Sequence, residues 1–168
     1  MKEINIRLER LTINGDKMKL RLPMLFLVLA AATHANGAET NHSKLMLNKT
    51  IVTSFYNMAF NQHQPAEAVA KYVGDRYIQH NPFVADGKKP FIDFFVGFQK
   101  QHPDGHIEIK RVIAEKDLVV VHVHSTLEKG DPGRAVMDIF RLENGKIVEH
   151  WDVGQSIPDN PSNKNTMF

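Results

Sequence analysis

The sequence predicts an α+β domain in which three helices pack on one face of a bent antiparallel sheet. Three observations indicate this class. Apolar residues recur at helical spacing over residues 43–61 and again over residues 89–101. Four segments with strand character then follow one another between residues 106 and 153, joined by short turn sequences. A run of helices followed by a run of strands is typical of an α+β fold.

Three helices are expected before the sheet. The first covers residues 43–61, and the second begins at Pro65, a favourable first-turn residue, and extends to Gly74, which favours a helix stop. A short extended segment over residues 77–82 ends at a proline. The third helix, from about Lys89 to Gln101, presents one thick apolar face made of Phe91, Phe94, Phe95 and Phe98.

The sheet is expected to be a meander of four strands over residues 106–114, 118–127, 134–142 and 147–153. Asn144 and Gly145 predict a tight hairpin between the last two strands, because a type I′ turn needs positive φ at both central residues. Residues 129–133, Lys-Gly-Asp-Pro-Gly, predict the preceding hairpin loop. The polar residues 158–168 are expected to form a flexible tail after a domain over residues 39–157.

Residues 1–38 are expected to direct export rather than to belong to the domain. Residues 22–32 form an apolar run of eleven, whereas a membrane-spanning helix needs about 20 residues. Basic residues precede this run and small residues follow it, which is typical of a secretory signal peptide. The acidic residues upstream do not fit that pattern, so we expect Met18 to be the true start. The alternative is a buried or interfacial N-terminal helix. We expect a periplasmic or secreted protein with no stable membrane span once the signal is removed.

Composition narrows the chemistry. The 168 residues carry a formal charge of +2, but residues 1–38 hold six of the 21 Lys and Arg and three of the 19 Asp and Glu. The remaining 15 basic and 16 acidic residues are nearly balanced, which argues against a nucleic-acid partner. The absence of cysteine excludes thiol nucleophiles, iron–sulfur centres and cysteine-ligated zinc.

The hairpin turns predict a polar row across three strands. If the first loop is centred on Asp131, His124 pairs with Asp138, and the second turn then pairs Asp138 with Trp151. Apolar residues, including Phe140, surround this row and would desolvate the carboxylate. A buried carboxylate with a histidine partner suits proton transfer at a carbon acid.

Other interpretations of these residues stay open. Asp138 and His124 could be a satisfied polar pair without a chemical role, or Asp138 could face solvent. His122, His124 and Asp138 could instead form a metal site with two histidines and one carboxylate. In the same register His150 and Asp152 fall on the opposite face, where we expect a surface position.

Three segments resemble a known family: YIQHNP, VVVHVHST and MDIFRLENGKIVEHWDV. Over residues 43–157 the chain is similar to the SnoaL-like polyketide cyclases of the nuclear-transport-factor-2-like superfamily. The resemblance implies a cone-shaped curved sheet whose concave face and helices enclose a ligand pocket. It also implies that Asp138 is the acid/base of an intramolecular aldol closure, that His124 assists it, and that no metal or organic cofactor takes part.

The resemblance implies further pocket residues and a substrate class. Tyr56, His80, Asn81 and Trp151 correspond to the pocket wall, and we expect His122 and Phe140 to contact the substrate as well. The predicted function is an exported acid/base enzyme for aldol condensation, cyclisation or isomerisation of a small apolar carbonyl compound. The alternative is a non-catalytic binding module of the same fold. The antibiotic cyclases act inside the cell, so an exported relative is expected to use another substrate.

We also expect a homodimer. The predicted register leaves an apolar second face on the sheet, which needs a covering of helices or a partner. Its residues are Val119, Val121, Val123, Met137 and Ile139.

Overall fold

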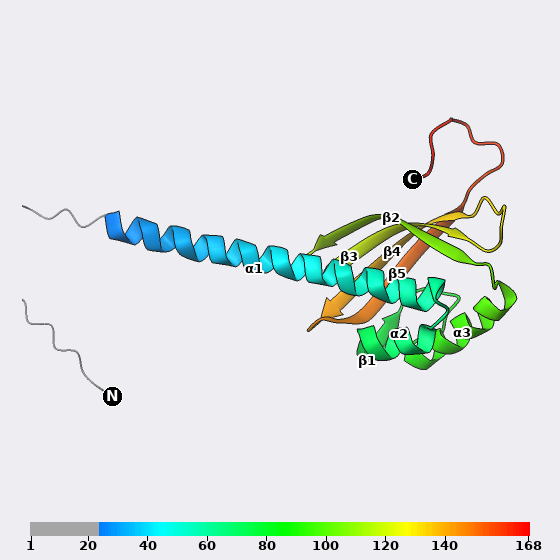
Figure 1. Ribbon diagram of the computed structural model, residues 1–168, viewed down its shortest axis with the longest axis horizontal. Helices are drawn as coiled ribbons and strands as arrows, with labels where there is room; N and C mark the ends of the chain where they lie inside the picture. Colours follow the sequence, from blue (N-terminus) through cyan, green and yellow to red (C-terminus); the bar gives the residue numbers. More distant parts are fainter. Residues whose placement is uncertain (1–23) are drawn as a thin grey trace, which may run out of the picture. The chain divides into compact units, whose positions relative to one another are not determined.

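The computed structural model describes residues 24–168, with side chains from residue 39 onward (Figure 1). The chain divides into two units after Asn36, and the second, Gly37–Phe168, is the compact domain considered below. The predicted start at Met18 and the basic residues before the apolar run lie outside the described residues. Within the described part of the chain, no helix is long and apolar enough to cross a bilayer.

All three helices precede the four-strand meander, as predicted, and a short strand separates the second from the third. α1 spans Met24–Tyr56 and continues into the π-helical turn η1, Asn57–Asn61; α2 spans Pro65–Tyr72 and α3 spans Lys88–Gln101. Pro65 occupies the first turn of α2, where its missing N–H costs nothing. α2 ends two residues before Gly74, because Val73 is already extended and begins the first strand.

Five strands form one sheet: β1 (Val73–Gln79), β2 (His106–Glu115), β3 (Leu118–Thr126), β4 (Arg134–Glu143) and β5 (Lys146–Ser156). Their order is β1-β5-β4-β3-β2. β2 to β5 make the predicted antiparallel meander, whereas β1 pairs with β5 in parallel. The α+β class is therefore confirmed, and the sheet is mixed rather than wholly antiparallel.

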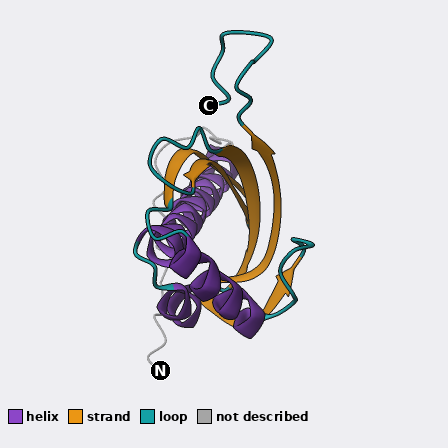
Figure 2. Cartoon of the chain, turned by 90° about the vertical axis from the view of Figure 1, so that its right-hand side faces the viewer, coloured by secondary structure: helices purple, strands orange, loops and turns teal. Residues whose placement is uncertain are grey.

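The helices cover the inner face of the curved sheet (Figure 2). This face, which we call the concave face, carries six fully or almost fully buried core residues: Val119, Val121, Val123, Phe140, Leu142 and Ile147. Phe55 of α1 is fully buried above them and packs edge-on against Phe140 at a centroid distance of 5.9 Å. The face expected to be unpartnered is thus the core for Val119, Val121 and Val123, and only Met137 and Ile139 lie on the opposite, convex face.

The register between β3 and β4 differs from the prediction by three residues. Ser125 pairs with Arg134, His124 pairs with Ala135, and Asp138 pairs with Val121. The loop is not symmetrical about Asp131, whose carboxylate accepts hydrogen bonds from the N–H groups of Leu127 and Gly133 at 2.8 Å each. An odd shift reverses the faces, so His124 lies on the convex face and Asp138 on the concave face.

The register between β4 and β5 is as predicted near the turn and differs beyond it. Asn144 and Gly145 have φ of 50° and 74°, as a type I′ turn requires, and Leu142 pairs with Ile147. A bulge then leaves Val148 without a partner, so that Arg141 pairs with Glu149. Beyond the bulge Asp138 pairs with Asp152 rather than with Trp151.

Candidate functional site

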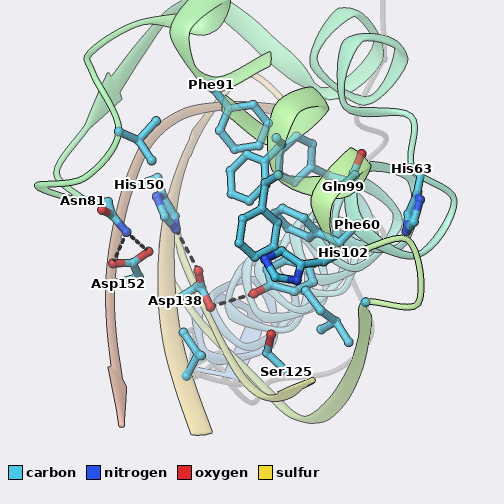
Figure 3. Close-up of a pocket in the computed structure, with 18 of the residues that line it drawn as sticks. Phe60, His63, Asn81, Phe91, Gln99, His102, Ser125, Asp138, His150 and Asp152 are labelled. Atoms are coloured by element: carbon cyan, nitrogen blue, oxygen red, sulfur yellow. Dashed lines mark hydrogen bonds and ion pairs between the residues drawn. The ribbon is translucent and has the colours of Figure 1, made fainter. Parts of the chain in front are cut away.

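A cavity of about 160 Å³ lies between the helices and the concave face. This is close to the volume of an engineered cavity that holds benzene, about 150 Å³. Its lining includes an aromatic wall and a polar wall around Asp138, and the side chains of His63, Gln99, His102 and Ser125 line the cavity elsewhere (Figure 3). The aromatic wall consists of Phe55, Phe60, Phe91, Phe95, Phe98 and Phe140. The polar wall consists of Tyr56, Tyr77, Gln79, Asn81, Asp138, His150 and Asp152.

Asp138 is the centre of the polar wall. It lies on β4 and is only 5% exposed. Its Oδ2 accepts a hydrogen bond from the Tyr56 hydroxyl at 2.8 Å, and its Oδ1 lies 2.9 Å from Nε2 of His150 (Figure 3). His150 is itself 6% exposed, so this pair is held away from water.

The hydrogen bonds around His150 define where its proton lies. Gln79 Oε1 accepts the backbone N–H of Asn81 at 2.9 Å, which fixes the orientation of the Gln79 amide. The same oxygen lies 2.9 Å from Nδ1 of His150, so Nδ1 must carry a proton. One further proton is then shared between Nε2 and Asp138 Oδ1. The pair is either an imidazole facing a carboxylic acid or an imidazolium facing a carboxylate, and moving one proton interconverts them.

Two buried phenols accompany this pair. Burial raises the pKa of Tyr56 well above its ordinary value, and the charge of Asp138 raises it further. Burial likewise raises the pKa of Tyr77, and the charges of Asp138 and Asp152 add to the effect. Both phenols therefore remain protonated donors at neutral pH. The Gln79 side chain partly offsets the raised pKa of Tyr77, and the Tyr77 O–H has no acceptor among the described residues.

Asp152 is a second carboxylate in the cavity. Both of its oxygens contact Nδ2 of Asn81, at 2.9 and 2.6 Å (Figure 3). Asn81 Oδ1 accepts the backbone N–H of Phe83, so the Asn81 amino group does point at Asp152. The potential ligand atoms of Asp138, His150 and Asp152 lie within 4.8 Å of one another, and among the described residues this trio could hold a metal ion. The His122–His124–Asp138 metal site is wrong, because its histidines and its carboxylate lie on opposite faces.

The structure brings four of the eight predicted site residues together at the cavity: Tyr56, Asn81, Asp138 and Phe140. The expected contact between His124 and Asp138 is wrong, since His124 Nε2 instead lies 2.8 Å from the Pro132 carbonyl oxygen. His122 contacts Arg111 on the convex face.

The remaining two predicted residues, His80 and Trp151, also lie away from the cavity. Their rings stack on each other at a centroid distance of 4.7 Å, and His80 contacts Glu149. They do not line the pocket, because Trp151 alternates with the inward-facing His150 and Asp152.

Four residues of the polar wall were not predicted as site residues: Tyr77, Gln79, His150 and Asp152. A signal for the first two was present, because Tyr77, Gln79 and Asn81 alternate along one extended segment and so point the same way. The alternation along the last strand shows that His150 and Asp152 share one face of the sheet. Whether that face is concave or convex depends on the bulge at Val148 and on the asymmetric loop at Asp131, which the sequence does not reveal.

The sequence of residues 52–150, more than half of the chain, matches the SnoaL-like domain. The chain therefore belongs to the SnoaL-like family, within the nuclear-transport-factor-2-like superfamily. No curated protein matches the sequence significantly.

Solved structures share the fold. AclR from Streptomyces galilaeus is 20% identical with a TM-score of 0.58, over 70% of this chain and 91% of its own. A candidate polyketide cyclase from Bacillus cereus is 21% identical with a TM-score of 0.54, over 62% and 71%. An LEH-like epoxide hydrolase from M. tuberculosis is 18% identical with a TM-score of 0.54, over 67% and 85%. At these identities the likeness concerns the fold alone.

Proposed function

We propose that the protein is an acid/base enzyme that acts on a small carbonyl compound by aldol condensation, cyclisation or isomerisation. The observation that carries this proposal is the buried Asp138, hydrogen-bonded to both His150 and Tyr56 at an aromatic-walled cavity. The polyketide cyclase assignment of a structure with the same fold supports this reaction class.

In the proposed reaction Asp138, as a carboxylate, accepts a proton from the carbon next to the substrate carbonyl. The electron pair of that C–H bond moves toward the carbonyl oxygen, where the Tyr77 hydroxyl can donate a hydrogen bond to the developing enolate. His150 compensates the charge of Asp138 while Gln79 holds its ring in place. In an isomerisation Asp138 then returns the proton to another carbon of the enolate. In an aldol closure the enolate carbon bonds to a second carbonyl carbon, the electron pair of that C=O moves to its oxygen, and Asp138 returns the proton to the resulting alkoxide.

The sequence-based partner of Asp138 is replaced in this proposal. His150 takes the place of His124, because His150 contacts the carboxylate and His124 lies on the other face of the sheet. The side chains described here can perform the proton transfers without a metal or organic cofactor.

The direct test uses proton exchange at carbon, which needs no knowledge of the natural substrate. Wild-type protein is expected to speed deuterium incorporation next to the carbonyl of cyclic ketones such as 1-indanone in D₂O, followed by NMR. Asp138→Asn should keep the fold and lower the catalysed rate by about 10²–10⁴-fold. Asp159→Asn, an exposed position with the same charge change, is the control. Equal rates for wild type and Asp138→Asn would show that Asp138 is not the base.

A non-catalytic binding module is the second candidate, favoured by the six phenylalanines that line the cavity. It predicts an apolar ligand that stays bound during purification, with affinity unchanged by Asp138→Asn. Mass spectrometry of protein denatured after native purification distinguishes the two.

We also propose that the protein is exported and forms a homodimer. The apolar run at residues 22–32 supports cleavage after Ala35 or Ala38, and N-terminal sequencing of protein from the periplasm or medium tests it. For the dimer, exposed apolar residues on the convex face supply the surface.

A further inference from the structure

The two carboxylates of the cavity lining lie next to each other, and the lining also includes four histidines: His63, His102, His106 and His150. Asp138 and Asp152 are paired in register on neighbouring strands, and both line the cavity. No lysine or arginine is among the described residues that line it. Because His150 and Asp138 share one proton and together carry no net charge, an anionic group placed at this end would approach the negative charge of Asp152 without a lysine or arginine to offset it.

The two carboxylates are not equally available to a ligand. Both oxygens of Asp138 already have protein partners, Tyr56 and His150. Asp152 has only the Asn81 amino group as a hydrogen-bond partner among the described residues. Because a carboxylate offers about four acceptor positions, Asp152 can still accept hydrogen bonds from a ligand in the cavity.

The cavity also offers one uncommitted donor. Tyr77 is only 4% exposed, and its O–H has no acceptor among the described residues. A buried hydroxyl without a partner is costly, and a ligand oxygen would satisfy it. The polar wall thus presents one acceptor group and one donor group beside an aromatic wall that suits a ring.

We propose that the pocket takes a neutral or cationic ring compound that carries a hydroxyl or amino donor beside a carbonyl-type acceptor, and that it rejects carboxylates and phosphates. Asp152 is the specificity-determining residue: it accepts the ligand's donor and repels anions, while Tyr77 donates to the ligand's acceptor. This inference rests on the proposed function for the location of the site and adds the charge class of the substrate.

Three probes of nearly the same planar shape test the charge preference: benzamide, benzoate and benzamidinium. Ligand-observed NMR titrations are run at pH 8, where an ordinary histidine is neutral. Benzamide and benzamidinium are expected to bind, benzamidinium through a paired contact to a carboxylate, and benzoate at least about tenfold more weakly than benzamide. Benzoate binding as tightly as benzamide would overturn the proposal, and so would the failure of all three probes to bind.

Variants then assign the preference to Asp152. Asp152→Asn keeps the contact with Asn81 and removes the charge, so the benzoate and benzamide affinities should approach each other to within about threefold. Asp152→Glu should retain the rejection of benzoate, and Asp159→Asn should leave all three affinities unchanged. Asp152→Ser is a second charge-removing variant in case Asp152→Asn does not fold, as judged by thermal unfolding.

Rejection of benzoate that persists in the charge-removing variants would contradict the role of Asp152. The titrations measure binding without turnover, so the charge preference and the proposed reaction are tested independently of each other. A protein that rejects benzoate but exchanges no protons keeps this inference and loses the proposed reaction.

Discussion

At the scale of single residues, hydrogen bonds fix the orientation of the Gln79 amide and the protonated nitrogen of His150. The Asn81 backbone N–H fixes the Gln79 amide, and the Gln79 oxygen then places a proton on Nδ1 of His150. Within the His150–Asp138 pair, the proton that can move is the one between Nε2 of His150 and Oδ1 of Asp138. A carboxylate buried without these partners would bear a desolvation cost that Tyr56 and His150 offset.

Tyr56→Phe tests this arrangement through stability. The substitution removes the hydroxyl that donates to Asp138 Oδ2 and leaves a buried acceptor with one fewer partner. The free energy of unfolding should fall by about 1–3 kcal/mol in urea titrations at pH 7. Tyr72→Phe is the matched control, since Tyr72 is not among the residues that line the cavity and is only half-buried. Equal losses for the two variants would contradict the role of Tyr56.

The two buried phenols also predict a pH dependence at the alkaline end. Burial, followed by the nearby carboxylates, raises the pKa of Tyr56 and Tyr77, whereas a phenol in the unfolded chain titrates near pH 10. Above about pH 10 the unfolded state releases protons that the folded state retains, so the free energy of unfolding falls as pH rises. Below that pH the contribution is present in full.

Urea titrations between about pH 8 and pH 11 measure this dependence. The double variant Tyr56→Phe/Tyr77→Phe should lose stability less steeply above about pH 10 than the wild type. Parallel curves would show that the two phenols are not held protonated by the fold.

At the scale of elements, the turns decided what could be predicted. The Asn144-Gly145 turn has an unambiguous sequence signal, and the pairing of Leu142 with Ile147 follows from it. The bulge at Val148 has no such signal, because an extra residue in a strand depends on packing across the sheet. The helices, the meander and Asp138 in the pocket were therefore predictable, whereas the partner of Asp138 was not.

The loop before β4 offers a test of the observed register. A Cβ at Gly133 would collide with the Ser125 carbonyl oxygen at a φ of 82°, whereas one at Gly130, with a φ of 87°, would meet open space. Gly130→Ala should cost about 1 kcal/mol for the backbone conformation alone, and Gly133→Ala at least about 2 kcal/mol more. Thermal or urea unfolding measures both. Similar costs would argue against the observed loop and its register.

At the scale of the whole molecule, the two faces of the sheet differ: the concave face lines the cavity, and the convex face carries exposed apolar residues. The concave face and the helices enclose the cavity. The convex face leaves Ile113, Met137 and Val153 exposed, at 58%, 37% and 72%. Met137 and Val153 are paired on β4 and β5, and Ile113 lies on the same face two strands from β4; exposed apolar side chains of this kind suit contact with a second copy.

The proposed dimer makes its own prediction. Met137→Lys/Val153→Lys should convert the dimer to a monomer in light scattering after gel filtration, without changing the cavity. Phe83→Lys, which replaces an exposed apolar residue outside that face, should leave the mass unchanged. A wild-type monomer would end the dimer proposal.

In the proposed reaction His150, and not His124, is the histidine that assists Asp138. The most direct measurement compares His150→Gln with His124→Gln in catalysed deuterium incorporation next to a ketone carbonyl. His150→Gln should lower the catalysed rate by about 10²-fold or more, because it removes the group that shares a proton with Asp138. His124→Gln should leave that rate within about twofold of the wild type, because His124 lies on the convex face, where it contacts the Pro132 carbonyl oxygen and Phe168. Loss of exchange in His124→Gln with full exchange in His150→Gln would contradict the account.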